Sequence, residues 1–350
     1  MPKRILMRDV AAKAGVSTMT VSRVISDSDN VKDETRRRVL QVIKELDYNP
    51  ESSARALAKG VTGNYGFWVS SSQGFDDLFR DIEKSIQIEL AQHDLSLLTY
   101  RSSNQARELP SMITQRKVDG VIAFGYALDA ETVHKIESYN VPVVLISTCL
   151  KMEGISSIDI DYYGGAFQAV DYLLGLGHRK VAFLGQQPQD FCSTQMYYGY
   201  CAAFHQAKAP LHPELVFRAM SSRADGFELG ERIWAAPSAA GAVFCCSDLL
   251  AVGVMEALSR HQVRIPQDFS VIGFGDSELA TVVRPQLSSV KVDHHEIGTL
   301  ATQILLAKRK DPESPVSNHT CAAHLIIRES CGARPARLGA PDQEPVERHY

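Results

Sequence analysis

The chain lacks any apolar run approaching the roughly 20 residues that a helix needs to cross a bilayer. Its first basic residues are not followed by an apolar core, so the start of the chain is not typical of a signal peptide. With 45% hydrophobic and 22% charged residues, the composition is that of an ordinary globular protein. We therefore expect a cytoplasmic protein without a membrane segment.

The glycine-rich motifs that hold phosphates or present a nucleophile are also missing. There is no GxxxxGK[ST] segment, no GxSxG segment follows a predicted strand, and Gly185-Gln186-Gln187 is not a GxGxxG loop. The His294-His295 pair has no third ligand nearby, so we expect a packed or surface pair rather than a metal site. The sequence predicts no enzyme, no cofactor and no metal.

Cysteine is present but lacks the spacing of a zinc site. The number of cysteines, seven, is odd, which does not suit a closed disulfide framework. In a cytoplasmic protein they are expected to be small buried hydrophobic residues. They stand at positions 149, 192, 201, 245, 246, 321 and 331.

Charge is distributed unevenly along the chain. Residues 1–60 hold 12 Lys and Arg against 8 Asp and Glu, whereas the remaining residues hold 25 against 33. A basic head on an acidic body suits a phosphate-binding module joined to a part that does not touch nucleic acid. A solvated basic face without a DNA role is the alternative that charge alone leaves open.

The segment from residue 7 to residue 25, MRDVAAKAGVSTMTVSRVI, carries the clearest motif. Apolar residues recur at helical spacing over residues 7–14, and Gly15 can end that helix in the left-handed conformation. Ser17 can then cap a second helix that runs to Ile25. Two short helices joined by a tight turn predict a helix-turn-helix.

A third helix is expected over about residues 33–46, with Leu40 among its buried residues. It completes a DNA-binding domain over residues 1–49. The segment ESSARALAK at 51–59 favours a helix but has too little apolar surface to be stable alone. We expect residues 50–60 to form a hinge helix and linker that orders on binding.

From Gly66 onward, apolar runs of strand length alternate with helical patterns. This alternation predicts parallel sheets covered on both faces, and about ten strands favour two Rossmann-like lobes over residues 61–330. Ligands of such folds bind at the carboxyl ends of strands, here between the lobes. Residues 331–350 are rich in Pro, Gly and charge and are expected to be disordered. The clearest strand runs are Phe67–Val69, Leu95–Leu98, Val118–Phe124, Val143–Ile146, Ile158–Ile160, Val181–Leu184, Ala242–Cys245 and Val271–Phe274.

Several segments, in this order, resemble the lactose-repressor (LacI/GalR) family of bacterial transcription factors: DVAAKAGVSTMTVSRVI, KELDYNP, SARALA, LLGLGHRKVAFLG, FCCSDLLAVGVMEAL and RIPQDFSVIGFGDSELA. The resemblance covers about residues 5–330. It implies a homodimeric regulator with an all-α helix-turn-helix head and an α/β body like the periplasmic sugar-binding proteins. GFGDSELA, SSVKVD and TMTVSRV most resemble the gluconate-utilisation branch, whose effectors are sugar acids.

In that family the second helix lies in the major groove of an operator. The resemblance places Thr18, Met19 and Arg23 near base edges and Ser17, Thr20 and Ser22 near phosphates. Arg can bind guanine through two hydrogen bonds, and a methyl group can pack on thymine. Contact with phosphate alone is the alternative for Met19 and Arg23.

Residues 51–58 resemble the family's hinge helix, which inserts a leucine into the minor groove. Leu57 stands at that position, beside Ala54 and Arg55. An apolar wedge between base steps kinks the duplex, and two hinges at a dimer axis predict a near-palindromic operator. Packing of Leu57 within the linker is the alternative.

The predicted effector pocket departs from the sugar-binding pattern. Met196 stands where many members have arginine, Ser247-Asp248 replaces Asn-Asp, and Gly275-Asp276 replaces a pair of carboxylates. These changes remove the side chains that could form bidentate hydrogen bonds to neighbouring hydroxyls of a sugar, and no basic residue is evident in the pocket segments. Asp248 has an alternative role as the cap of helix 249–261. The expected effector-binding residues are Ser147, Asp161, Met196, Ser247, Asp248 and Asp276.

The sequence thus predicts a DNA-binding transcriptional repressor whose affinity for double-stranded operator DNA is set by a small metabolite. A sugar, a sugar acid or a sugar phosphate is expected between the two lobes of each subunit of a homodimer. An activator or dual regulator of the same family would use the same contacts. A sugar-binding protein without a DNA role is the further alternative, although it would lack the helix-turn-helix.

Overall fold

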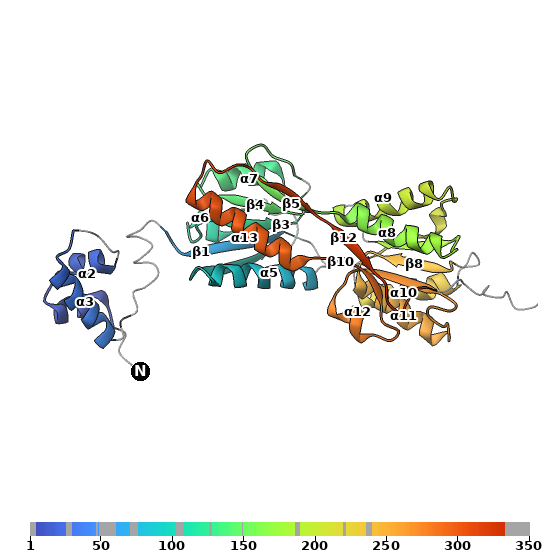
Figure 1. Ribbon diagram of the computed structural model, residues 1–350, viewed down its shortest axis with the longest axis horizontal. Helices are drawn as coiled ribbons and strands as arrows, with labels where there is room; N and C mark the ends of the chain where they lie inside the picture. The colour runs from blue at the N-terminus through green and yellow to red at the C-terminus, as the bar shows by residue number, and fades with distance from the viewer. Residues whose placement is uncertain are drawn as a thin grey trace, which may run out of the picture.

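The computed structural model describes residues 5–25, 30–46, 48, 61–70, 76–102, 108–125, 128–148, 150–185, 190–219, 222–235 and 240–332. A helical head is followed by a body of two α/β lobes (Figure 1). In the described part, no helix is long and apolar enough to pass through a membrane. The proposed hinge at residues 50–60 and residues 333–350 of the predicted tail lie outside the described residues. Cys331, the first residue of that predicted tail, is instead buried in the body, where its thiol lies 3.0 Å from Ser288 Oγ.

The head contains the helices α1 (Met7–Ala14), α2 (Thr18–Ile25) and α3 (Asp33–Glu45). Gly15 ends α1 with φ 65°, a conformation that glycine adopts without steric cost. The first helix, the turn and the second helix are therefore confirmed as the sequence predicts.

A small apolar core holds the head together, and each of its helices contributes to it. The prediction for Leu40 is wrong: its side chain is 49% exposed, because α3 turns Val39 and Val42 inward instead. Lys13 of α1 pairs with Glu45 of α3 at 2.9 Å, on the outside of this core. The buried core residues are Val10, Ala11, Ala14, Val21, Val24, Val39, Val42 and Tyr48.

The N-terminal lobe is built on a six-stranded sheet in the order β11-β5-β4-β3-β1-β2, and all its neighbouring strands are parallel. Its strands are β1 (Asn64–Ser70), β2 (Ser96–Ser102), β3 (Val121–Phe124), β4 (Val143–Ile146), β5 (Ser156–Ile160) and β11 (Asn318–Cys321). Its helices are α5 (Asp76–Ala91), α6 (Ser111–Thr114), α7 (Ala130–Glu137) and α13 (His294–Lys310).

The C-terminal lobe has a second six-stranded sheet in the order β12-β10-β9-β8-β6-β7, parallel except for the β10–β12 pair. Its strands are β6 (Val181–Gly185), β7 (Val216–Arg218), β8 (Ala242–Cys245), β9 (Ser270–Gly275), β10 (Ser288–Val292) and β12 (Ala323–Ile326). Its helices are α8 (Tyr162–Gly175), α9 (Phe191–Gln206), η1 (Pro213–Leu215), α10 (Arg223–Ala235), α11 (Asp248–Arg260) and α12 (Glu278–Val282). The predicted fold class is confirmed.

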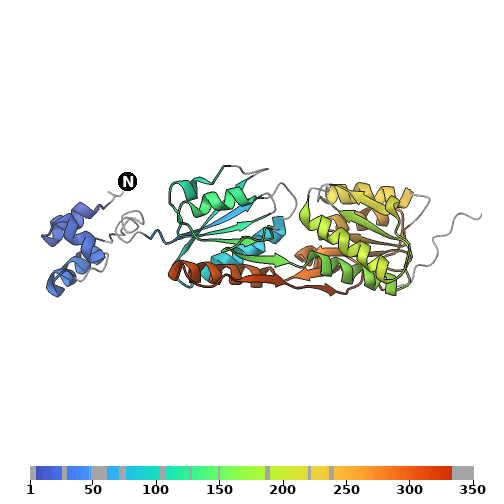
Figure 2. The ribbon, with the colours of Figure 1, turned by 90° about the horizontal axis from the view of Figure 1, so that it is seen from above.

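The chain crosses between the lobes from β5 to α8, from β10 to α13 and from β11 to β12. Figure 2 shows these crossing segments along one flank of the body. One apolar cluster extends from Tyr65 and Phe67 in the N-terminal lobe to Phe183 and Phe204 in the C-terminal lobe. The crossings therefore pass through a shared core, so the lobes are mechanically coupled.

His178 lies in the turn between α8 and β6 and is 1% exposed. Its Nε2 is 3.1 Å from the Oγ of Ser270, the first residue of β9. Burial disfavours the charged imidazolium and lowers the pKa of His178 to about 4. In the folded body this imidazole therefore stays neutral down to about pH 4, whereas the same side chain in the unfolded chain takes up a proton near pH 6.5.

Acidification should destabilise the body through His178. Between pH 6.5 and pH 4, His178 binds a proton in the unfolded chain but not in the folded chain, so the free energy of unfolding should fall by up to about 3 kcal/mol. His178→Gln should remove this part of the pH dependence, whereas exchange of the exposed His205 should leave it in place. Denaturant titrations at several pH values test this, and equal slopes for wild type and His178→Gln would contradict it.

Candidate DNA-binding surface and ligand cleft

The face of α2 that points away from the core carries the residues expected to contact DNA. Met19 is 63% exposed although it is a large apolar residue, and Thr18 and Arg23 are also exposed. Thr20 and Ser22 are half-buried, at the edges of the same face. The helix therefore presents methyl, hydroxyl and guanidinium groups outward, a combination suited to base edges and phosphates.

Ser17 caps α2, as its position in the sequence predicts. Its Oγ accepts a hydrogen bond from the backbone N–H of Thr20 at 3.1 Å, and the two hydroxyls are 2.9 Å apart. The cap fixes the start of the helix and leaves both hydroxyls at its positive end. Hydroxyls at a helix N-terminus are well placed for an anion. The hinge residues Ala54, Arg55 and Leu57 lie outside the described residues.

In the body, Ser147 lies where the N-terminal lobe meets the C-terminal lobe. It follows β4 in the left-handed conformation with φ 51°, and it is buried. Its Oγ is 3.0 Å from the Tyr162 hydroxyl at the start of α8 and 3.8 Å from Cys192 Sγ on α9. Ser147 thus connects the carboxyl end of the first sheet to two helices of the other lobe.

Asp161 caps α8, because its Oδ1 accepts from the N–H of Gly164 at 2.7 Å. Its position directly after β5 places it on the first crossing between the lobes. Asp161 and Ser147 are the two expected effector residues that line a cavity of about 220 Å³.

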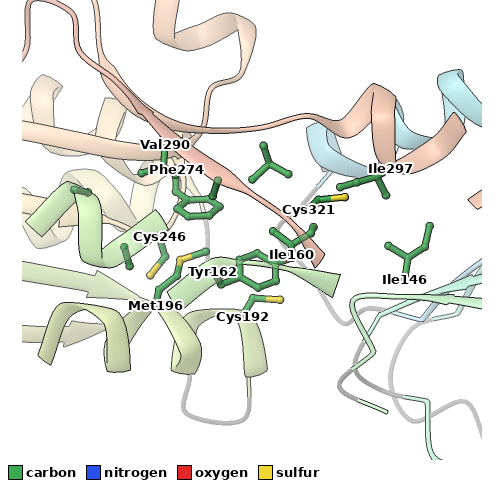
Figure 3. Close-up of a cluster of buried hydrophobic side chains, with 14 of the residues drawn as sticks. Ile146, Ile160, Tyr162, Cys192, Met196, Cys246, Phe274, Val290, Ile297 and Cys321 are labelled. Atoms are coloured by element: carbon green, nitrogen blue, oxygen red, sulfur yellow. The ribbon is translucent and has the colours of Figure 1, made fainter. Parts of the chain in front are cut away.

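Met196 is completely buried on α9. Figure 3 shows its thioether beside Cys246, Tyr162 and Phe274, in a cluster of buried hydrophobic side chains. Burial raises the pKa of Cys246 to about 12, so this thiol is neutral at physiological pH. Apolar and sulfur groups therefore surround Met196, the position at which many family members have an arginine.

Ser247 is the cap of α11, since its Oγ accepts from the N–H of Leu250 at 3.3 Å. The alternative in which Asp248 caps this helix is wrong. Asp248 Oδ2 instead accepts from the backbone N–H and the hydroxyl of Ser277 at 2.7 and 2.9 Å, and its Oδ1 accepts from Ser289 Oγ at 2.5 Å. Burial raises the pKa of Asp248 and these hydrogen bonds oppose the rise.

Asp276 follows β9 with φ 50° and forms an ion pair with Arg328 at 2.6 Å. Both side chains are largely buried, and Arg328 Nη1 also donates to the Leu287 carbonyl at 2.8 Å. The Asp276 backbone N–H donates to Ser289 Oγ at 3.0 Å. The hydrogen bonds of Asp248 and the ion pair of Asp276 thus connect the segments at the carboxyl end of the second sheet.

Arg218, at the end of β7, is a basic residue that was not predicted from the sequence to lie near the ligand cleft. Its guanidinium lies 5.2 Å from the Phe183 ring centroid and 5.0 Å from that of Tyr197, and Nη1 donates to Ser193 Oγ at 3.2 Å. β7 has only three residues, VFR, so no apolar run marked this edge strand. Arg218 places a positive charge at the first turn of α9, close to the residues expected to bind an effector.

The paired histidines pack against α5. His295 Nδ1 is 3.0 Å from Ser85 Oγ, and His294 Nδ1 is 3.9 Å from Asp81. Within the described ranges, no group of three or more His, Cys, Asp or Glu side chains is arranged to hold a metal ion. These histidines contribute to the contact between α13 and α5.

Asp248→Ala should lower the free energy of unfolding of the body by about 3 kcal/mol, because it leaves the buried Ser289 hydroxyl and the partly buried donors of Ser277 without their acceptor. Glu153→Ala, which removes an exposed carboxylate, is the matched control and should change stability by less than about 0.5 kcal/mol. Denaturant unfolding of both variants is the measurement. Equal stability of Asp248→Ala and wild type would show that the hydrogen bonds of Asp248 do not stabilise the body.

Comparison with known proteins agrees with this geometry. Residues 6–51 match bacterial regulatory proteins of the lacI family, and residues 170–331 match a periplasmic binding protein-like domain. Catabolite control protein A of Priestia megaterium is 30% identical over 334 residues, which cover 92% of this chain and 97% of that protein. The transcriptional repressor PurR of Mannheimia succiniciproducens is 29% identical over 329 residues, which cover 93% and 98%.

Solved structures show the same architecture. The lac repressor dimer bound to operator and the anti-inducer ONPF superposes with a TM-score of 0.79 at 24% identity, covering 94% of this chain and 99% of that one. The complex of the regulator CelR with cellobiose gives a TM-score of 0.69 at 26% identity and covers 93% of this chain and all of that one. By sequence, architecture and the helix-turn-helix of its head, the chain belongs to the lacI family of bacterial regulatory proteins.

Proposed function

We propose that the protein is a cytoplasmic, homodimeric transcriptional repressor that binds a near-palindromic operator and responds to a small sugar or sugar acid. The observation that carries the proposal is the outward face of α2, where Met19 and Arg23 stand exposed on a helix firmly capped by Ser17. This role requires binding and no catalysis. An activator or dual regulator would use the same face.

The DNA contacts follow from the chemistry of that face. The Arg23 guanidinium can donate two hydrogen bonds to a guanine, and the Met19 side chain can pack on a thymine methyl group. Ser17, Thr20 and Ser22 supply hydroxyls for phosphates on either side. Two heads related by a dimer axis would read two half-sites in opposite directions. A sugar-binding protein without a DNA role has no use for such a face.

Control of DNA binding is proposed to pass through the crossings between the lobes. A ligand that prefers one relative position of the lobes shifts the equilibrium by its difference in affinity for the two states. The shared apolar core supports this route, because movement of one lobe displaces side chains of the other. A sugar-like effector is supported by the likeness to the CelR complex with cellobiose.

Selection from a pool of random duplex DNA with the full-length protein tests the proposed function. We expect enrichment of a near-palindromic site. Arg23→Ala should weaken binding to that site by about 1–3 kcal/mol and reduce the base specificity at one position in each half-site. Arg179→Ala, which removes an exposed arginine from the body, is the control. Failure to enrich any sequence, with or without sugars and sugar acids, would overturn the proposal.

The hinge gives a separate prediction. Leu57→Ala should weaken operator binding far more than binding to random DNA, because a minor-groove wedge acts only where the duplex is kinked. Titrations of both DNAs at one salt concentration measure the two losses, since affinity for DNA depends strongly on salt. Equal losses on the two DNAs would argue for a packing role of Leu57 in the linker.

A further inference from the structure

A cavity of about 220 Å³ lies at the junction of the two lobes, beside the crossing from β5 to α8. Met196, Ser247, Asp248 and Asp276 do not line it, so it is distinct from most of the expected effector positions. Its volume is below the roughly 300–1,000 Å³ typical of pockets for drug-sized ligands, which favours a molecule no larger than a monosaccharide. The lining residues are Ser147, Lys151, Asp159, Ile160, Asp161, Tyr162, Tyr163, Phe191, Gln195 and Thr320.

The charges in the cavity wall are unequal. Asp159 and Asp161 contribute two carboxyl groups and Lys151 contributes one ammonium group. Asp159 is half-buried and pairs in register with Thr320 of the neighbouring strand β11. Burial raises the pKa of Asp159, and the charge of Lys151 only partly opposes this effect. A cation brought into the cavity would compensate the partly desolvated carboxylate.

The uncharged part of the wall suits the same kind of ligand. Tyr163 is 44% exposed although it is large and aromatic, and Phe191 lines the cavity from the first turn of α9. Aromatic faces attract ammonium groups. The Gln195 amide and the Thr320 hydroxyl add donors and acceptors suited to hydroxyl groups.

We propose that this cavity binds a small hydroxylated amine, of which an amino sugar is the simplest example. Its ammonium group interacts with the Asp159 carboxylate, and its hydroxyls interact with Gln195 and Thr320. The inference names the chemical class of the effector and in that respect rests on the proposed function. The binding itself can be tested without DNA.

The position of the cavity gives the ligand control over the lobes. Ser147, Lys151 and Asp159 belong to the N-terminal lobe, whereas Phe191 and Gln195 belong to α9 of the C-terminal lobe. A molecule held by both sets binds one relative position of the lobes more tightly than another. This difference in affinity is the condition for a ligand to shift a conformational equilibrium.

Isothermal titration of the full-length protein with three matched probes tests the inference. Glucosamine carries an ammonium group, glucose carries a hydroxyl at that position, and gluconate carries a carboxylate. We expect glucosamine to bind at least about tenfold more tightly than glucose or gluconate, because the interaction with a charged partner is present only in the amine. The melting temperature should also rise with ligand concentration, and the rise should be larger for glucosamine than for glucose or gluconate.

Asp159→Asn should reduce glucosamine affinity at least about tenfold and leave the weaker binding of glucose unchanged. Glu153→Gln removes the same charge from an exposed position nearby and should leave both affinities unchanged. Preference for gluconate, equal binding of the three probes, or equal loss in the two variants would overturn the inference. Operator selection in the absence of any sugar is unaffected by these outcomes, so failure here is distinguishable from failure of the proposed function.

Discussion

The structure depends on one apolar core that passes from one lobe to the other. Strands and helices of both lobes contribute to it, and the chain crosses through it from β5 to α8 and from β10 to α13. Close-packed interiors transmit displacement because they contain few voids that could absorb it. The Ser147, Tyr162 and Cys192 contacts lie at this junction, so a change in lobe position must rearrange them. Coupling between a ligand and the head therefore begins with packing.

Four aspartates near the carboxyl ends of strands in the body fall into two groups with different contacts. Asp248 and Asp276 are satisfied within the C-terminal lobe, by serine donors and by Arg328 respectively. Asp159 and Asp161 line a cavity shared between the lobes. A carboxylate already engaged by hydrogen bonds or an ion pair inside a protein has little to offer a ligand, whereas the partly desolvated Asp159 gains from a cationic partner. All four aspartates lie near the carboxyl end of a strand, so this position in the sequence could not distinguish the two groups.

Local signals in the sequence predicted the head and most of the body. Gly15 and Ser17 mark the helix boundaries through their own conformational and capping preferences, and the eight apolar runs correspond to strands. The runs failed to reveal β7, β10, β11 and β12, because these strands lie at sheet edges or carry polar residues such as NHTC. The partners of Asp248 and Asp276 were also beyond prediction, since Ser289 and Arg328 are distant in sequence.

The order of the elements along the chain has a consequence for biosynthesis. The N-terminal lobe needs α13 and β11 to cover and complete its sheet, yet these elements follow every strand of the C-terminal sheet except β12 in sequence. A ribosome must therefore have translated residues up to Cys321 before β5 acquires its last neighbour. Until then the nascent chain exposes an unpaired strand edge, a site at which chains can aggregate. A message truncated before the codon for residue 318 would leave that edge open.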